Sequence, residues 1–179
     1  SFVIMMIQTK QIGLGIKRVL AIVLALFTFL LLSASVIQAS ENQFITIVNP
    51  VRISAYNKDP SLSLLAEYSV VKKYSLPATW LLTYDAMLDK DIASVVGKMD
   101  KNQTFGVFLE VTPSFAKAAQ VVYNDTGNWH HAASVFLSGY SQEDRIKLID
   151  KVFETFKNNF GYYPEVTGSW WTDAFSLSY

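Results

Sequence analysis

Three acidic residues lie where short apolar segments end, so they could do chemistry together. Asp85, Glu110 and Asp173 each follow a segment with strand character or lie near its end. The carboxyl ends of parallel strands meet at one edge of a sheet, so the three carboxylates could line one cleft. Two carboxylates that flank a glycosidic bond are the working groups of most glycoside hydrolases. As structural alternatives, Asp85 could cap a helix and Asp173 a turn, and Glu110 could pair with Lys72 or Arg52.

Aromatic and polar residues near the same strand ends are candidates for binding a substrate. Aromatic rings stack on the apolar faces of sugars, although packing in the core is the ordinary role of a buried tryptophan. Adjacent strand residues point to opposite faces, so we expect one of Trp170 and Trp171 in the core and the other at a cleft. Arg52 could hold a carboxylate or phosphate bidentately or form a surface salt bridge. The substrate-binding candidates are Trp170, Trp171, Trp80, Asn49 and Arg52.

Composition excludes several other kinds of site. The chain of 179 residues has no cysteine, so it has no disulfide and no thiolate nucleophile or ligand. Its only histidines, His130 and His131, are adjacent and therefore project in different directions instead of chelating one metal. The formal net charge is zero, which argues against nucleic acid as a partner. No serine-hydrolase elbow or phosphate-binding glycine loop is present. We therefore expect no metal and no cofactor.

The N-terminal segment has the features of an export signal. Lys10, Lys17 and Arg18 precede an apolar run at 19–32, and small residues follow as far as Ala39. This pattern predicts a secretory signal peptide over residues 1–39. The stretch 19–40 carries no charge and could instead be an uncleaved membrane anchor. Either interpretation predicts that residues 40–179 form an extracytoplasmic domain, secreted or anchored to the membrane.

Segments with strand and helix character alternate along the remaining chain. This alternation indicates a parallel sheet with right-handed crossovers in an α/β domain at 40–179. Four strand–helix units predict a partial irregular (β/α) barrel that is truncated at the C-terminus. The best-defined helix begins after Ser141, with Asp144 as a capping partner, and stops at Gly161. The predicted strands are 43–48, 78–84, 104–111 and 166–171, and the predicted helices are 60–74, 85–99, 114–120, 130–137 and 141–160.

The order of these segments resembles the polysaccharide deacetylases, a family of irregular barrel hydrolases that remove N-acetyl groups from chitin-like and peptidoglycan polymers. Pro77-Ala-Thr-Trp80 is similar to their second strand, and the run Thr104 to Pro113 resembles the strand that carries their histidine pair. The helix from Ser141 with its following glycine and proline resembles the lead-in to their arginine motif. The resemblance spans residues 43–179 and implies their fold and a carbohydrate substrate.

The residues of the family's metal site do not carry over. Asn49 stands in the region of its paired aspartates, and Phe108 and Thr112 stand at the places of its two histidines. An aspartate and both histidines are needed for its zinc, so we expect no metal-dependent deacetylation. The leading hypothesis is an exported carbohydrate-associated domain without that site, a pseudoenzyme that binds glycan. The alternatives are a metal-independent glycoside hydrolase and a non-catalytic interaction domain of the cell envelope.

Overall fold

The computed structural model describes residues 20, 22, 23, 45–128 and 130–179. The chain divides into two compact units, 1–44 and 45–179, and the second contains the α/β domain. The predicted signal peptide or anchor at 1–39 lies outside the described residues except for residues 20, 22 and 23, which are helical and exposed. Within the described ranges, no helix combines the length and the apolar composition needed to cross a bilayer.

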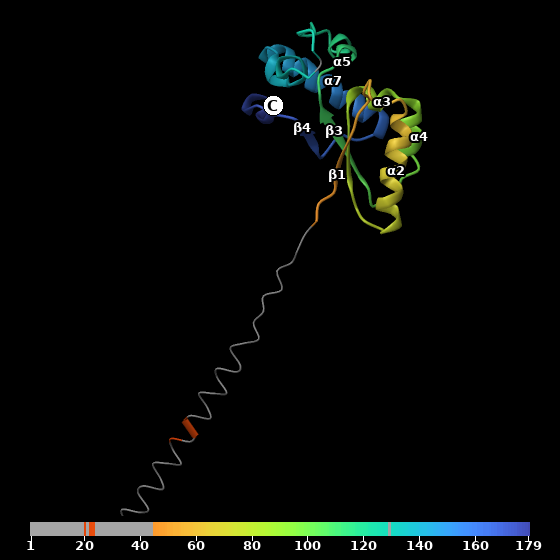
Figure 1. Cartoon of the computed structure of the whole chain (residues 1–179). Helices are drawn as coiled ribbons and strands as arrows, with labels where there is room; N and C mark the ends of the chain where they lie inside the picture. The colour runs from red at the N-terminus through yellow and green to blue at the C-terminus, as the bar shows by residue number, and fades with distance from the viewer. Residues whose placement is uncertain (1–19, 21, 24–44, 129) are drawn as a thin grey trace, which may run out of the picture. The chain divides into compact units, whose positions relative to one another are not determined.

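The domain is built on a four-stranded parallel sheet whose strands follow one another in chain order. The strands are β1 (Val48–Val51), β2 (Thr79–Leu82), β3 (Thr104–Leu109) and β4 (Thr167–Ser169). Every connection between them contains at least one helix, and the sheet curls into a half-barrel (Figure 1). The mixed α/β class and the partial barrel predicted from the alternation of segments are confirmed.

Helices of very different lengths connect the strands. The helix α2 (Pro60–Lys73) leads from β1 to β2, and its buried face consists of Leu64, Tyr68 and Val71. Together with α3, α4 and α7 it supplies the helical side of the core. The helical elements are α2 (Pro60–Lys73), α3 (Tyr84–Leu88), α4 (Lys90–Val96), α5 (Pro113–Ala118), α6 (Ala132–Val135), the 3-10 turn η2 (Leu137–Gly139), α7 (Gln142–Phe160) and α8 (Ala174–Ser178).

The first strand lies further along the chain than predicted. The pair Asn49-Pro50, which follows the strand predicted at 43–48, lies inside β1. The carbonyl groups of Ile47 and Val51 accept hydrogen bonds from β2 and its next residue, so the nitrogen of Pro50 points away from β2. A proline without an N–H group is tolerated there because β1 is at the edge of the sheet among the described strands. Arg52, and not Asn49, therefore stands at the carboxyl end of the first strand.

The predicted helix at 85–99 is two helices with separate N-caps. Thr83 Oγ1 accepts from the Ala86 N–H at the start of α3. Asp89 Oδ1 accepts from the N–H groups of Asp91 and Ile92, and this second cap starts α4 at a new angle. The apolar pattern, which is continuous across both helices, did not reveal the break.

The helix α7 agrees with the prediction. Ser141 Oγ accepts from the Asp144 N–H at 3.2 Å and donates to the Asp144 carboxylate at 2.8 Å. Gly161 ends the helix with φ +82°, the left-handed conformation that glycine adopts without steric cost. The buried face of α7 comprises Leu148, Ile149, Val152, Thr155 and Phe156.

The two faces of the sheet have different neighbours. Trp80, Leu82, Val107 and Leu109 belong to the core that the helices cover. The alternate residues lie on the concave side, where a Cβ at Gly106 would stand 2.1 Å from the Val166 carbonyl oxygen and 2.8 Å from a Leu81 methyl group. The absence of a side chain at this position lets β4 approach β3 on the curled sheet. Successive strand residues alternate between the faces, so the first residue after each strand continues the concave side.

Candidate functional site

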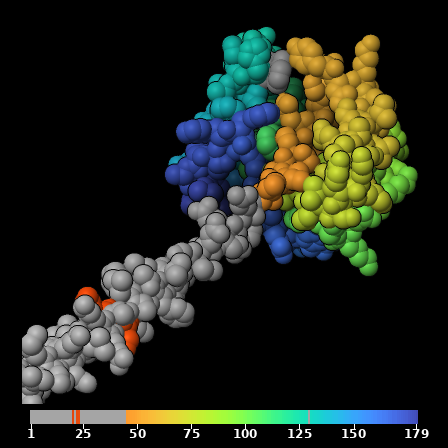
Figure 2. Space-filling model, turned by 60° about the horizontal axis from the view of Figure 1, so that its bottom comes forward, coloured from red at the N-terminus to blue at the C-terminus, as the bar shows by residue number. Residues whose placement is uncertain are grey.

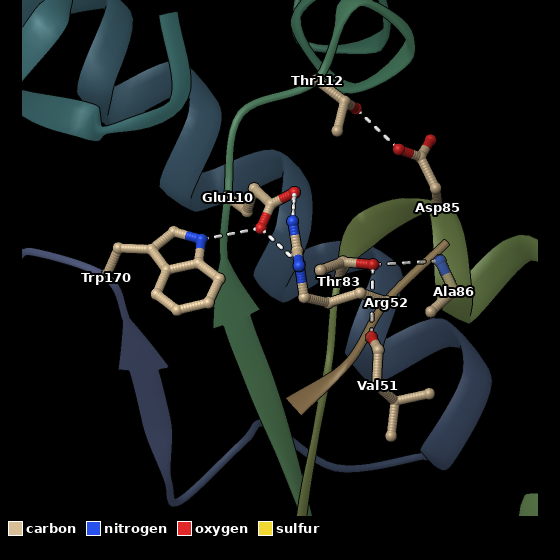
Figure 3. Close-up of polar contacts among 8 residues, drawn as sticks. All are labelled: Val51, Arg52, Thr83, Asp85, Ala86, Glu110, Thr112 and Trp170. Carbon is tan, nitrogen blue, oxygen red and sulfur yellow. Dashed lines mark hydrogen bonds and ion pairs between the residues drawn. The ribbon is translucent and has the colours of Figure 1, made fainter. Parts of the chain in front are cut away.

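The first residue after each strand lies at the carboxyl edge of the sheet, and three of these four residues form one cluster of contacts. The four residues are Arg52 after β1, Thr83 after β2, Glu110 after β3 and Trp170 after β4. Strand pairing places Arg52 level with Thr83, and Glu110 level with Trp170. Alternation along the strands directs all four toward the concave side, at the edge where (β/α) barrels carry their sites. Figure 3 shows Arg52, Glu110 and Trp170 in mutual contact.

Arg52 and Glu110 form a bidentate ion pair at the centre of this cluster. Arg52 Nε donates to one carboxylate oxygen at 2.6 Å, and Nη2 donates to the other at 2.8 Å. The glutamate is 6% exposed, and the arginine side chain is 21% exposed. The planar fork of an arginine matches a carboxylate, so this pair fixes both side chains. Of the two partners considered for Glu110, Arg52 is the one observed, and Lys72 pairs with Asp100 instead.

Trp170 completes the cluster from the fourth strand. Its indole Nε1 donates to Glu110 Oε2 at 2.8 Å. The Arg52 guanidinium carbon lies 5.0 Å from the centre of the Trp170 ring, and the edge of Phe108 contacts the ring at a centroid distance of 5.3 Å. The residue is nevertheless 50% exposed, so a large part of the ring surface remains open to a ligand. The indole is held by its polar edge and presents an apolar surface to solvent.

A pocket of about 240 Å³ adjoins the exposed tryptophan. In the space-filling view, the segment around β1 is exposed between α2 and the C-terminal segment (Figure 2). The pocket walls combine the aromatic ring with hydroxyl, amide, guanidinium and carboxylate groups. Asn57 Nδ2 donates to Ser63 Oγ at 3.1 Å across this wall. The lining residues are Pro50, Val51, Arg52, Ser54, Asn57, Pro60, Ser63, Leu64, Glu67 and Trp170.

Three substrate-binding candidates differ from expectation. Trp80 is completely buried in the helix-covered core and donates to Gln103 Oε1 at 2.9 Å, so its ring is not accessible to a sugar. Trp171 was expected on the face opposite to Trp170, with one of the two in the core. Both are exposed, because β4 ends at Ser169 and neither belongs to the strand. Asn49 lies within β1, below the strand-end cluster.

Asp85 belongs to a different set of contacts from Glu110. It lies in the first turn of α3, whose cap is Thr83, so the cap predicted for Asp85 is wrong. Its carboxylate accepts from Thr112 Oγ1 at 2.6 Å and also from the Ser114 hydroxyl. Both donors stand at the start of α5, so Asp85 ties the loop after β3 to α3 (Figure 3).

Asp173 caps α8 and forms an ion pair with α7. Its carboxylate accepts from the Ser176 N–H at 3.0 Å, from the Ser176 hydroxyl at 2.7 Å and from Arg145 Nη1 at 2.8 Å. Burial raises the pKa of Asp173, but the hydrogen bonds from Ser176 and the charge of Arg145 outweigh it, so the pKa lies below its ordinary value. Asp173 was considered as the cap of a turn, and the structure shows it as the cap of the helix α8. The three carboxylates thus have separate partners.

Metal-binding side chains do not gather in the described part of the chain. Residues 45–128 and 130–179 contain no group of three or more histidine, aspartate or glutamate side chains placed to hold an ion. His131 Nδ1 lies 2.9 Å from Thr126 Oγ1, and the His130 and His131 rings lie nearly perpendicular, 5.5 Å apart. The cluster at the strand ends can therefore act through hydrogen bonding, charge and ring stacking.

The polar wall of the pocket escaped the sequence interpretation. Ser54, Asn57, Ser63 and Glu67 come from the loop after β1 and from the first half of α2. Placing β1 at 43–48 left this loop too far from the strand end to be considered. The clue available in the sequence was Glu67, the only charged residue between Pro60 and Val71.

The fold and the site define a parallel α/β half-barrel with an aromatic and polar cluster at the carboxyl ends of its strands. Comparison with protein-family models, with curated proteins and with solved structures found no match. The residues of the cluster and its pocket are therefore the basis for assigning a function.

Proposed function

We propose that this chain is an exported domain that binds cell-surface glycan at the carboxyl ends of its strands. The observation that carries the proposal is Trp170, a half-exposed ring fixed by Glu110 beside a pocket with hydroxyl and amide groups. A sugar ring offers an apolar face for stacking and hydroxyl groups for hydrogen bonding, and this wall supplies partners for both.

The proposal includes a fold of the polysaccharide-deacetylase type without the zinc chemistry of that family. The parallel strand order and the half-barrel support the fold type. Phe108 contacts Trp170, and Thr112 donates to Asp85. These two residues occupy the places of the family's histidines, and neither side chain is a zinc ligand. The proposed function is therefore glycan binding without metal-dependent turnover.

The glycosidase alternative gains less from the arrangement of the carboxylates. A glycosidase needs two carboxyl groups that flank one bond, about 5–10 Å apart. Glu110 is engaged by Arg52 and Trp170, Asp85 by two hydroxyl groups, and Asp173 by a helix cap. Each carboxylate thus has a structural partner, whereas Trp170 remains 50% exposed and presents part of its ring to solvent.

The test is a binding and hydrolysis screen of the purified 179-residue chain on oligosaccharides of chitin and peptidoglycan. We expect binding without release of acetate or reducing sugar. Trp170→Ala should weaken binding about tenfold, the equivalent of a lost stacking contact, and Trp170→Phe should retain most of it. Trp171→Ala is the matched control, since Trp171 does not line the pocket. Equal losses for the two alanine variants, or no binding to any polymer, would contradict the proposal.

A further inference from the structure

One carboxylate in the glycan pocket forms no ion pair with a described residue. Glu67 lies on the exposed side of α2 and lines the pocket together with Arg52 and Trp170. Among residues 45–128 and 130–179, its carboxylate has no hydrogen bond and no ion pair. Within α2, the positions three and four residues away hold Leu64, Val70, Ser63 and Val71, so no helical neighbour can neutralise it.

The nearest cation of the pocket is engaged elsewhere. Arg52 directs Nε and Nη2 to the carboxylate of Glu110, at 2.6 and 2.8 Å. The guanidinium and that carboxylate cancel each other, and Glu67 leaves the group of three with a net charge of −1. An anionic ligand such as a uronic acid would meet an arginine already committed to Glu110 and an unbalanced carboxylate. The negative charge of Glu67 would repel the carboxylate of such a ligand and weaken its binding.

We propose that the pocket selects amino sugars with an unacetylated, cationic amine, an inference that rests on the proposed function. In that arrangement Trp170 stacks on the sugar ring, and the ammonium group donates to Glu67. An N-acetyl group has no positive charge and can use only the ring and the hydroxyl wall. The favoured ligand class is therefore a polymer of glucosamine type, in preference to its N-acetylated or uronic-acid counterparts.

The other polar groups of the wall fit this assignment. Ser63 Oγ accepts from Asn57 Nδ2 at 3.1 Å, and Ser54 Oγ accepts from the Tyr56 N–H at 3.2 Å. Ser54 Oγ retains a proton that a sugar hydroxyl group can accept. The Ser63 hydroxyl donates to the Asp59 carbonyl oxygen at 3.5 Å, so a sugar hydroxyl group would compete with that long contact. These contacts serve neutral and cationic sugars alike, so the discrimination is assigned to Glu67.

The experiment measures dissociation constants of the 179-residue chain for glucosamine and N-acetylglucosamine tetramers by calorimetry. We expect the glucosamine tetramer to bind about fivefold more tightly, the value of one exposed ion pair, and the advantage to shrink as salt is added. Glu67→Gln should reduce the preference to less than about twofold without changing affinity for the acetylated tetramer. Glu143→Gln, the same charge change on α7 away from the pocket, should keep the wild-type preference.

Each outcome separates this inference from the proposed function. Equal binding of both tetramers, or a preference that survives Glu67→Gln, overturns the amine selectivity and leaves glycan binding intact. Tighter binding of a uronic-acid tetramer likewise overturns the selectivity alone. Absence of binding to every oligosaccharide overturns the proposed function and the selectivity together.

Discussion

Arg52 and Glu110 are joined across a strand that lies between them. They follow β1 and β3, whereas β2 separates those strands in the sheet, and the two bonds between them measure 2.6 and 2.8 Å. Neighbouring strands are about 4.8 Å apart, so a flat sheet would hold the two strands about 10 Å apart. The long arginine side chain spans the remaining distance on the concave side of the curled sheet. The ion pair therefore links the first and third strands across β2 on the concave side of the sheet.

Removal of the buried partner tests the energetic weight of this pair. Glu110→Ala should lower the free energy of unfolding by about 2–3 kcal/mol, because it leaves the Arg52 guanidinium without its carboxylate. The value lies below that of a fully buried pair, since the arginine side chain is 21% exposed and regains water. Urea unfolding followed by circular dichroism measures the loss. Glu143→Ala, on an exposed turn of α7, should lower the free energy of unfolding by less than about 0.5 kcal/mol. Equal losses for Glu110→Ala and Glu143→Ala would contradict a stabilising role of the ion pair.

The close approach of β4 to β3 can be tested at Gly106. An alanine methyl group there would overlap the Val166 carbonyl oxygen, and backbone cannot move aside as a flexible side chain can. Gly106→Ala should therefore destabilise the domain by about 1–3 kcal/mol. Gly97→Ala is the control, because Gly97 has φ −64° and its added methyl group would lie 3.3 Å from the Ala93 oxygen. A Gly106→Ala protein as stable as the Gly97→Ala protein would contradict the packing described for β4.

The lowered pKa of Asp173 predicts acid sensitivity. Its folded value lies below the ordinary value of 3.8, so its contribution to stability is complete above that value. This contribution is lost as the pH falls through the folded pKa. Between about pH 5 and pH 2, Asp173→Asn should lose less stability than the wild type, as measured by urea midpoints at each pH. Asp91→Asn on the exposed side of α4 should follow the wild-type curve, and a parallel curve for Asp173→Asn would refute the assignment.

The raised pKa of Tyr140 predicts a loss of stability at alkaline pH. Desolvation raises its pKa to about 12, against a smaller lowering by the Asn124 N–H. The raised value means that its contribution is complete below the ordinary value of 10.0 and is lost as the pH rises toward the folded pKa. Tyr140→Phe should therefore flatten the decline of the unfolding midpoint over this alkaline interval. Tyr74→Phe, at an exposed position, should leave the decline unchanged, and an unaltered slope for Tyr140→Phe would disprove the prediction.

The fold was more predictable from the sequence than the site because fold signals are local. Ser141, Asp144 and Gly161 specify both ends of α7 through their own backbone contacts, and the prediction was correct there. Asn49-Pro50 misled the placement of β1, since a proline in an edge strand depends on which neighbour the strand has. Likewise the cap at Asp89 interrupts an apolar pattern that continues across it.

The site could be predicted only in part because its residues are distant in the sequence and come together only when the strands pair. Arg52 was correctly named as a possible partner of Glu110. Trp170, predicted as a substrate-binding ring, lines the pocket, and its binding role stays a prediction. The sequence could not show that Trp80 is buried and Trp171 exposed, since both depend on where the strands begin and end. Glu67 was missed because its place in the pocket wall follows from the loop after β1 and not from any motif.

The strand order has a consequence for how the site is assembled during synthesis. Each strand pairs with the one that precedes it in the chain, so every new strand can dock onto an edge that has already formed. Arg52 is made first, Glu110 can engage it once β3 is in place, and Trp170 arrives only with the fourth strand. Among the described strands, a nascent domain thus carries its ion pair before Trp170 joins the cluster from β4.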